Sequence, residues 1–196
     1  MVTSPQPRAP PPRHHVLRYV AIALLALIVI VGIAVLIAWL IVKPKRFVYT
    51  IEDGSVNNFK LANNHLNSTI DFILWAENPN RRISVYYDSI HVSVVYEDQT
   101  IGFNMVEPFH QPHQNVTRLG VTVVAQNLAL SKSSYKDLWI DKSSRRLELD
   151  VHVKAKIRFK VGLLQTKHRT LRLLCSPVIA TFSSKSSEIT KCDIDV

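Results

Sequence analysis

The segment LELDVHVKAKIRFK, residues 147–160, decides the fold because apolar and polar residues alternate along its whole length. Every second residue is apolar, and each residue between them is charged or a histidine. Side chains on a strand point to opposite faces in turn, so this period puts one face on a core and the other in water. The segment therefore predicts a half-buried antiparallel strand, with Val153 facing the core and Lys154 facing solvent.

Other parts of the chain after residue 47 show the same period. Apolar residues alternate over 70–76 and over 90–96, and each run is followed by turn-forming residues, at 78–80 and 97–99. Many short strands without a regular alternation of strands and helices predict an all-β sandwich of about seven strands. Further strand candidates are 116–125, 171–182 and 189–196, and a short helix is expected at 133–140.

A long apolar run precedes this domain. Residues 19–42 contain no charged residue, and a helix of that length is about 36 Å long, enough to cross a hydrocarbon core of about 30 Å. Tyr19 and Trp39 lie near its ends, where aromatic rings suit the headgroup level. A buried core helix would be shorter and amphipathic, and a cleaved signal peptide has an apolar run of about 7 to 15 residues. We therefore expect one transmembrane helix, retained as a signal anchor.

The first 18 residues are rich in proline, which favours an extended, disordered tail. Within it, residues 7–13 could dock into an SH3-like groove or serve only as a spacer. The expected organisation is a tail over 1–18, a transmembrane helix over 19–42 and a β-sandwich domain over 47–196.

The formal net charge of +9 is concentrated around the apolar run. Six of the 24 basic residues flank the run, and no acidic residue precedes Glu52; the remaining 18 basic residues face 15 acidic ones. Cations at this boundary suit anionic lipid headgroups, so we expect contact with membrane lipid and no nucleic-acid function. The six residues are Arg8, Arg13, Arg18, Lys43, Lys45 and Arg46.

Two sequons and both cysteines follow the apolar run. Asn67 and Asn115 each begin an Asn-x-Thr sequence, and such acceptors carry glycans in the secretory pathway, although sequons also arise by chance. Basic residues occur on both sides of the run, so charge alone does not orient it. The sequons and cysteines favour a cytosolic N-terminus and an extracellular domain at the plasma membrane.

Cys175 and Cys192 are the only cysteines, and they lie near the ends of two adjacent strand candidates. In an oxidising compartment they are expected to form a disulfide. The alternative is a pair of buried thiols, because only α-carbons about 4.4 to 6.8 Å apart permit the bond.

No catalytic, cofactor or metal site is expected. The five glycines form neither a phosphate-binding loop nor a nucleophile elbow. Glu107, His110 and His113 could approach a metal ion, but prolines at 108 and 112 prevent the helix that would align them. We therefore expect neither an enzyme nor a metalloprotein.

A row of cations lies on the polar side of the strand at 147–160. Such a row can be a solvated outer face, or it can bind an acidic surface such as lipid headgroups or anionic wall polysaccharide. The row consists of Lys154, Lys156, Arg158 and Lys160.

A series of short motifs resembles one plant family, the harpin-induced-like and non-race-specific-disease-resistance-like family. The resemblance implies a late-embryogenesis-abundant group 2 domain, an immunoglobulin-like or fibronectin-like sandwich on a plasma-membrane anchor, acting in pathogen and stress responses. It implies no enzyme activity. The motifs are KPxxF at 43–47, NPN at 78–80, YYDS at 86–89, YEDQ at 96–99, FKVG at 159–162, KHRTL at 167–171 and CSPV at 175–178.

Two functions remain open at this point. The chain can be an anchored interaction or signalling module that meets an unknown protein or cell-wall partner, or a lipid-handling module that holds an acyl chain between its sheets. A continuous apolar cavity would favour the second function and a packed core the first. Small residues at Ala34 and Ala38 leave a homo-oligomer possible.

Overall fold

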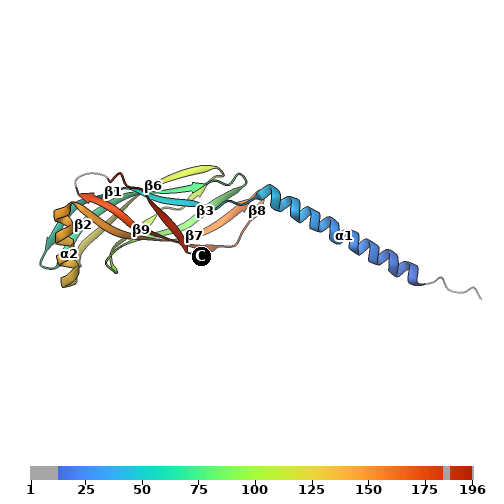
Figure 1. The fold of residues 1–196 in the computed structure, drawn as a ribbon, viewed down its shortest axis with the longest axis horizontal. Helices are drawn as coiled ribbons and strands as arrows, with labels where there is room; N and C mark the ends of the chain where they lie inside the picture. Colours follow the sequence, from blue (N-terminus) through green and yellow to red (C-terminus); the bar gives the residue numbers. More distant parts are fainter. Residues whose placement is uncertain (1–12, 183–185, 196) are drawn as a thin grey trace, which may run out of the picture. The chain divides into compact units, whose positions relative to one another are not determined.

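The computed structural model describes residues 13–182 and 186–195. It divides into two compact units, Met1–Lys43 and Pro44–Val196 (Figure 1). The first contains helix α1 (Arg13–Val42). Within it, Val16–Ile37 has a mean hydropathy of 3.4 and none of its most apolar window is buried, so by length and composition this helix can cross a membrane.

The helix begins earlier than the sequence predicted. Residues 13–18 are helical, although they were expected to belong to the disordered tail. The reason is that no proline lies between Pro12 and Pro44, and a helix tolerates proline only in its first turn. Residues 1–12 lie outside the described part of the chain, so the disorder of the tail stays a prediction.

The second unit is all-β apart from one helix, as predicted. The described residues form ten strands, where about seven were expected. Two of the ten, β5 and β8, are only three and two residues long and account for part of the difference. The elements are β1 (Val48–Ala62), β2 (His65–Asn78), β3 (Ile83–Tyr96), β4 (Gln99–Val106), β5 (Phe109–Gln111), β6 (Asn115–Ala129), α2 (Lys132–Ser144), β7 (Arg146–Val161), β8 (Leu164–Gln165), β9 (Arg169–Phe182) and β10 (Thr190–Asp195).

Hydrogen bonding runs continuously through the strands in the order β4-β3-β7-β9-β10-β1-β2-β6, so the two layers of the sandwich belong to one curved sheet. Its two ends, β4 and β6, are bridged by side chains. Asn104 Nδ2 donates to the carbonyl of Thr122 at 2.6 Å, and Gln99 Nε2 donates to that of Ala129 at 2.8 Å. The sheet is therefore nearly closed, and these side chains occupy two backbone carbonyls on the β6 edge.

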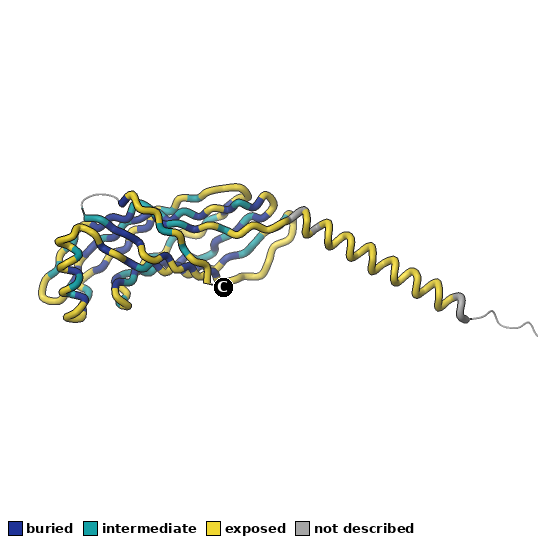
Figure 2. Tube along the Cα trace, in the orientation of Figure 1, coloured by how far each residue is buried: buried dark blue, intermediate teal, exposed yellow. Residues whose placement is uncertain are grey.

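The predicted strand register is confirmed. Val153 is 3% exposed whereas Lys154 lies in solvent, and the alternating residues over 70–76 and 90–96 face the same core. Along the strands, buried and exposed positions alternate, whereas α1 is exposed along its described length (Figure 2). The core therefore lies between the layers, and alternate residues over long stretches of β2, β3 and β7 contribute to it.

One space in the interior, between the layers, is too small for a ligand. The space bounded by Tyr49, Leu74, Tyr87, Ala155 and Leu173 measures about 10 Å³. A single water needs roughly 10 to 15 Å³, so an acyl chain does not fit there. The small volume of this space favours the interaction function over a lipid held between the sheets.

Candidate binding groove on the outer sheet face

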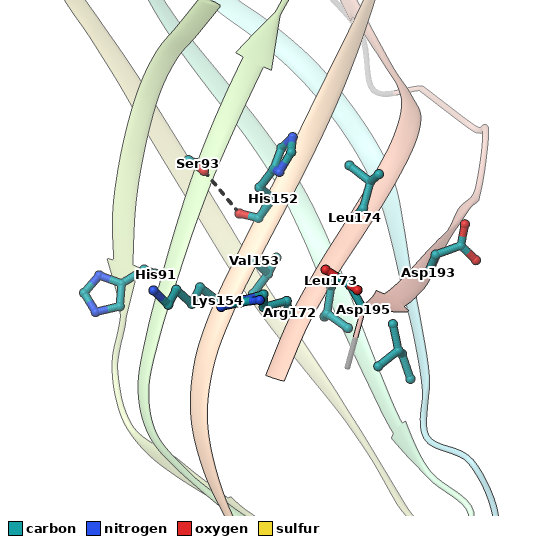
Figure 3. Close-up of a pocket in the computed structure, with 11 residues that line it drawn as sticks. His91, Ser93, His152, Val153, Lys154, Arg172, Leu173, Leu174, Asp193 and Asp195 are labelled. Carbon is teal, nitrogen blue, oxygen red and sulfur yellow. Dashed lines mark hydrogen bonds between the residues drawn. The ribbon is translucent and has the colours of Figure 1, made fainter. Parts of the chain in front are cut away.

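The outward face of β7 is the centre of a groove that runs across four strands. In the strand register, Lys154 of β7 lies between His91 of β3 and Arg172 of β9, and Arg172 is opposite Asp195 of β10. A second row runs parallel to the first, from Ser93 to His152, Leu174 and Asp193 (Figure 3). These eight residues belong to the lining of a groove of about 690 Å³.

The sign of the charge changes across the groove. Lys154 and Arg172 occupy the middle, with the two histidines beside them on the β3 and β7 side. Asp193 and Asp195 line the opposite side on β10. The arrangement can hold a negatively charged group over the central cations and a hydrogen-bond donor against the carboxylates.

Strand β10 is held in this position by the two cysteines. Cys192 lies opposite Cys175 in the ladder between β10 and β9, and a disulfide joins them. Their α-carbons are 4.1 Å apart, slightly closer than the expected range of about 4.4 to 6.8 Å, which is the usual range for the bond and not a strict limit. Cys175 is fully buried, so the bond lies on the core side of the sheet. The pairing expected from the sequence is thus present in the structure, and its formation in the purified protein stays a prediction.

The predicted cationic row divides into two kinds of residue. Lys154, Lys156 and Lys160 are exposed and make no ion pair within the part of the chain that the structure describes. Arg158 is different, because its guanidinium donates from Nε to Asp88 Oδ2 at 2.7 Å and from Nη2 to Asp88 Oδ1. The row therefore offers three free ammonium groups, and Arg158 is engaged within the domain.

The Asp88 carboxylate is held in its charged form. The hydrogen bonds from Arg158 lower the pKa of Asp88 below its usual range, and the same bonds raise the pKa of Arg158. His168 Nε2 lies 3.4 Å from Asp88 Oδ2, and the guanidinium of Arg158 lies 5.5 Å from the Tyr86 ring centroid. These contacts organise the surface next to the groove.

The other predicted site residues lie elsewhere on the domain. Asn67 of β2 and Asn115 at the start of β6 are both exposed. Their side-chain oxygens accept hydrogen bonds, from the Asn127 amide at 2.8 Å and from the Thr117 hydroxyl at 3.2 Å. Glycosylation at these two positions stays a prediction.

The groove residues do not form a nucleophile and base pair. Ser93 Oγ donates to the backbone carbonyl of His152 at 3.4 Å rather than to an imidazole (Figure 3). Of the loop residues considered for a metal, His110 stacks against Tyr86 with ring centroids 4.3 Å apart. Among the described residues, no three His, Cys, Asp or Glu side chains are grouped so that they could hold a metal ion.

Asp193 and Asp195 were not predicted as part of a site. A signal for them exists in the sequence, since pairing Cys192 with Cys175 in an antiparallel ladder puts Asp195 opposite Arg172. Asp88 carries no such signal, because it lies at an irregularity between Tyr87 and Ser89 in the ladder with β7.

Comparison with known proteins identifies the family. The family model described as late embryogenesis abundant protein matches residues 74–176, which is more than half of the chain. The chain belongs to this family. The match contains β3 and β7, which carry the centre of the groove, whereas β10 with its two aspartates lies beyond it.

Three Arabidopsis thaliana proteins illustrate the similarity within the family. NDR1/HIN1-like protein 3 is 36% identical over 179 residues, covering 88% of this chain and 78% of that protein. NDR1/HIN1-like protein 10 is 30% identical over 182 residues, covering 88% and 80%. An uncharacterized protein is 34% identical over 169 residues, covering 85% and 76%. The resemblance drawn from the sequence motifs is confirmed.

Proposed function

We propose that this protein is an interaction module of plant defence and stress responses, anchored in the plasma membrane by α1, whose groove binds a carboxylate-bearing partner. The observation that carries the proposal is the cross-strand row of His91, Lys154 and Arg172 on a rigid sheet. Several cations acting together bind a polyanion more strongly than any one alone, and the attraction weakens with salt. No enzyme activity and no cofactor are part of the proposal.

The proposed position at the membrane follows from the apolar helix and from the family. Its N-terminus faces the cytosol and the domain faces the cell wall, an orientation supported by the sequons at Asn67 and Asn115 and by the paired cysteines. Outside the cell, carboxylate-bearing partners are of two sources, acidic wall polysaccharide and acidic protein segments. Lipid handling between the sheets is the less favoured function because the space there is about 10 Å³.

Binding of the full-length protein in nanodiscs to immobilised polygalacturonate and to polyglutamate tests the proposal. Lys154→Glu with Arg172→Glu should weaken binding at least tenfold, and added salt should weaken wild-type binding. The matched control, Lys60→Glu with Lys132→Glu, changes the net charge equally at exposed positions away from the groove. Equal losses in the two double variants would show that only net charge matters and would contradict the proposed groove.

The orientation has its own measurement. Endoglycosidase should reduce the apparent mass of the wild type and leave an Asn67→Gln, Asn115→Gln variant unchanged. External protease on intact cells should remove the domain. Failure of both results would place the domain in the cytosol.

A further inference from the structure

Four segments gather at the end of the domain where the chain leads into β1, which we call the tether end: residues 44–47, 78–83, 112–114 and 162–168. Hydrogen bonds tie the first two together, because the Lys45 amide donates to Asn80 Oδ1 at 2.6 Å and Asn80 Nδ2 donates back to the Lys45 carbonyl at 2.9 Å.

The remaining two segments are joined to the same end. Asn78 Nδ2 donates to the carbonyl of Pro112 at 2.9 Å, which brings the third segment alongside. Ile83 pairs with Val161 at the end of β7, immediately before the fourth segment. Phe47 stacks on Phe159 with ring centroids 5.7 Å apart, so the fourth segment also adjoins the first.

The tether end carries an excess of positive charge. The four segments contain five lysines and arginines and no aspartate or glutamate. The acidic residue beside them, Asp88, lies 3.4 Å from His168 and is already paired with Arg158. At the opposite end, α2 contains Asp137 and Asp141 among its lysines. A charge distribution of this kind matches the phosphate groups of a lipid surface. The five residues are Lys45, Arg46, Arg81, Arg82 and Lys167, all of them exposed.

Two leucines project from the tether end. Leu163 is 100% exposed and Leu164 is 79% exposed, at the turn between β7 and β8. The turn is held in place by hydrogen bonds between Thr166 and Phe159, one of which joins the Thr166 amide to the Phe159 carbonyl at 2.9 Å. Neighbouring exposed leucines at a fixed turn, flanked by cations, are a combination typical of a surface that enters a lipid interface.

The chain itself limits how far this end can move from the helix. Residues 43–47 are the five residues between α1 and β1. An extended residue spans at most about 3.5 Å, so the start of β1 stays within roughly 20 Å of the end of the helix. If the helix crosses a membrane, the start of β1 can therefore move no more than roughly 20 Å from the end of the helix.

We propose that the β7–β8 turn is a second membrane contact, in which Leu163 and Leu164 enter the lipid interface and the five cations of the tether end bind headgroup phosphates. This inference rests on the proposed membrane anchor. It commits the exposed leucines to a bilayer rather than to a second copy of the chain, because the four segments carry a net positive charge and two such surfaces repel each other.

A fluorescent probe on full-length protein in lipid vesicles tests the contact. Leu164→Cys is labelled with an environment-sensitive fluorophore, and the control is Ile140→Cys on α2, where an apolar residue is 58% exposed at the opposite end. The vesicles contain phosphatidylcholine with 30% phosphatidylglycerol, with or without nitroxide-labelled acyl chains. We expect at least threefold stronger nitroxide quenching at position 164 than at position 140.

Charge and self-association give two further readouts. Changing Arg81, Arg82 and Lys167 to glutamine should reduce the quenching at position 164 by at least half. Equal quenching at positions 164 and 140 would overturn the inference. A second copy of the chain could instead cover the turn. The probe at position 164 would then be shielded from water without nitroxide quenching, and it would become exposed as the protein is diluted in lipid. That result would also overturn the inference.

Flotation separates failure of the anchor from failure of the contact. Wild-type protein that leaves the vesicles in alkaline carbonate would contradict the proposed membrane anchor. Protein that floats with the vesicles but shows no quenching at position 164 would contradict the second contact alone.

Discussion

The two faces of β7 differ in burial and in charge, although their residues alternate along one strand. The inward face carries Val151, Val153 and Ala155, all buried against the opposite layer. The outward face carries His152, Lys154 and Lys156, all exposed. The inward face determines the fold because burial of apolar surface stabilises it, whereas the outward face can change with little effect on folding and is free to bind a partner.

The largest expected effect comes from placing the same charge on each face. Val153→Asp puts an unpaired carboxylate into the core and should lower the free energy of unfolding by several kcal/mol, enough to unfold a domain of ordinary stability. Lys154→Asp should change it by less than about 1 kcal/mol. Thermal unfolding followed by circular dichroism measures both, and similar melting temperatures for the two variants would contradict the strand register.

The disulfide lies on the core side of the sheet, but it also affects the outer face. It attaches β10, the strand that carries Asp193 and Asp195, to β9. Replacing Cys175 and Cys192 by alanine should cost roughly 3 kcal/mol through loss of the loop constraint. The same variant should also alter binding in the groove, because β10 loses its covalent attachment.

Non-reducing peptide mapping tests the bond directly. A peptide containing Cys175 linked to one containing Cys192 is expected. Two freely alkylated cysteines in protein purified without reductant would contradict it.

A glycine pair sharpens the contrast between crowded and open positions. A Cβ atom at Gly54 of β1 would overlap the backbone carbonyl oxygen of Ile179 in β9, whereas a Cβ atom at Gly120 would meet nothing within 4 Å. Gly54→Ala should therefore destabilise the domain by about 1 to 3 kcal/mol. Gly120→Ala should be neutral or slightly stabilising. Chemical denaturation of both variants gives the comparison, and equal midpoints would show that β1 does not approach β9 so closely.

The smallest effect on stability is expected from Asp88 of β3, which pairs with Arg158 of β7. Because its pKa is lowered in the folded state by Arg158, the pair stabilises the fold above the ordinary aspartate pKa of about 3.9, and this contribution is lost as the pH falls through the folded value. Asp88→Asn should lower the melting temperature by about one or two degrees at pH 7, since the pair is partly exposed. The difference should shrink below about pH 4.

Asp98→Asn, at an exposed turn, is the control for the pH series. It should follow the wild type throughout. If the difference in melting temperature between wild type and Asp88→Asn grows on acidification, the pKa of Asp88 is not lowered in the folded state.

Strict alternation explains why much of the fold was predictable. In strands β2, β3 and β7, buried positions alternate over long stretches against a single core, so their sequence shows the period directly. Strand β1 was missed because irregularities at 52–55 and 57–60 interrupt its alternation. Strand β4 was missed because it lies at the end of the sheet, where Phe103 is 75% exposed and Met105 is 65% exposed.

The candidate site was predictable only in part, for a related reason. The cations of β7 follow from the period of one strand. Their neighbours come from strands far apart in the sequence, and neither the register of β3 nor the irregularity at Asp88 can be deduced from one strand alone. Sequence patterns thus identify which face is outward, and tertiary pairing decides that Arg158 is engaged while Lys154 remains free.

The attachment of the chain at β1 has a mechanical consequence. This strand lies inside the sheet, paired with β2 along almost its whole length and with β10 near its start. Tension applied through residue 44 therefore pulls along β1 and loads many ladder bonds together in shear, instead of peeling them one at a time. The paired hydrogen bonds between Lys45 and Asn80 take the first load. A domain bound to the wall through its groove would in this way remain folded while the membrane is drawn away from it.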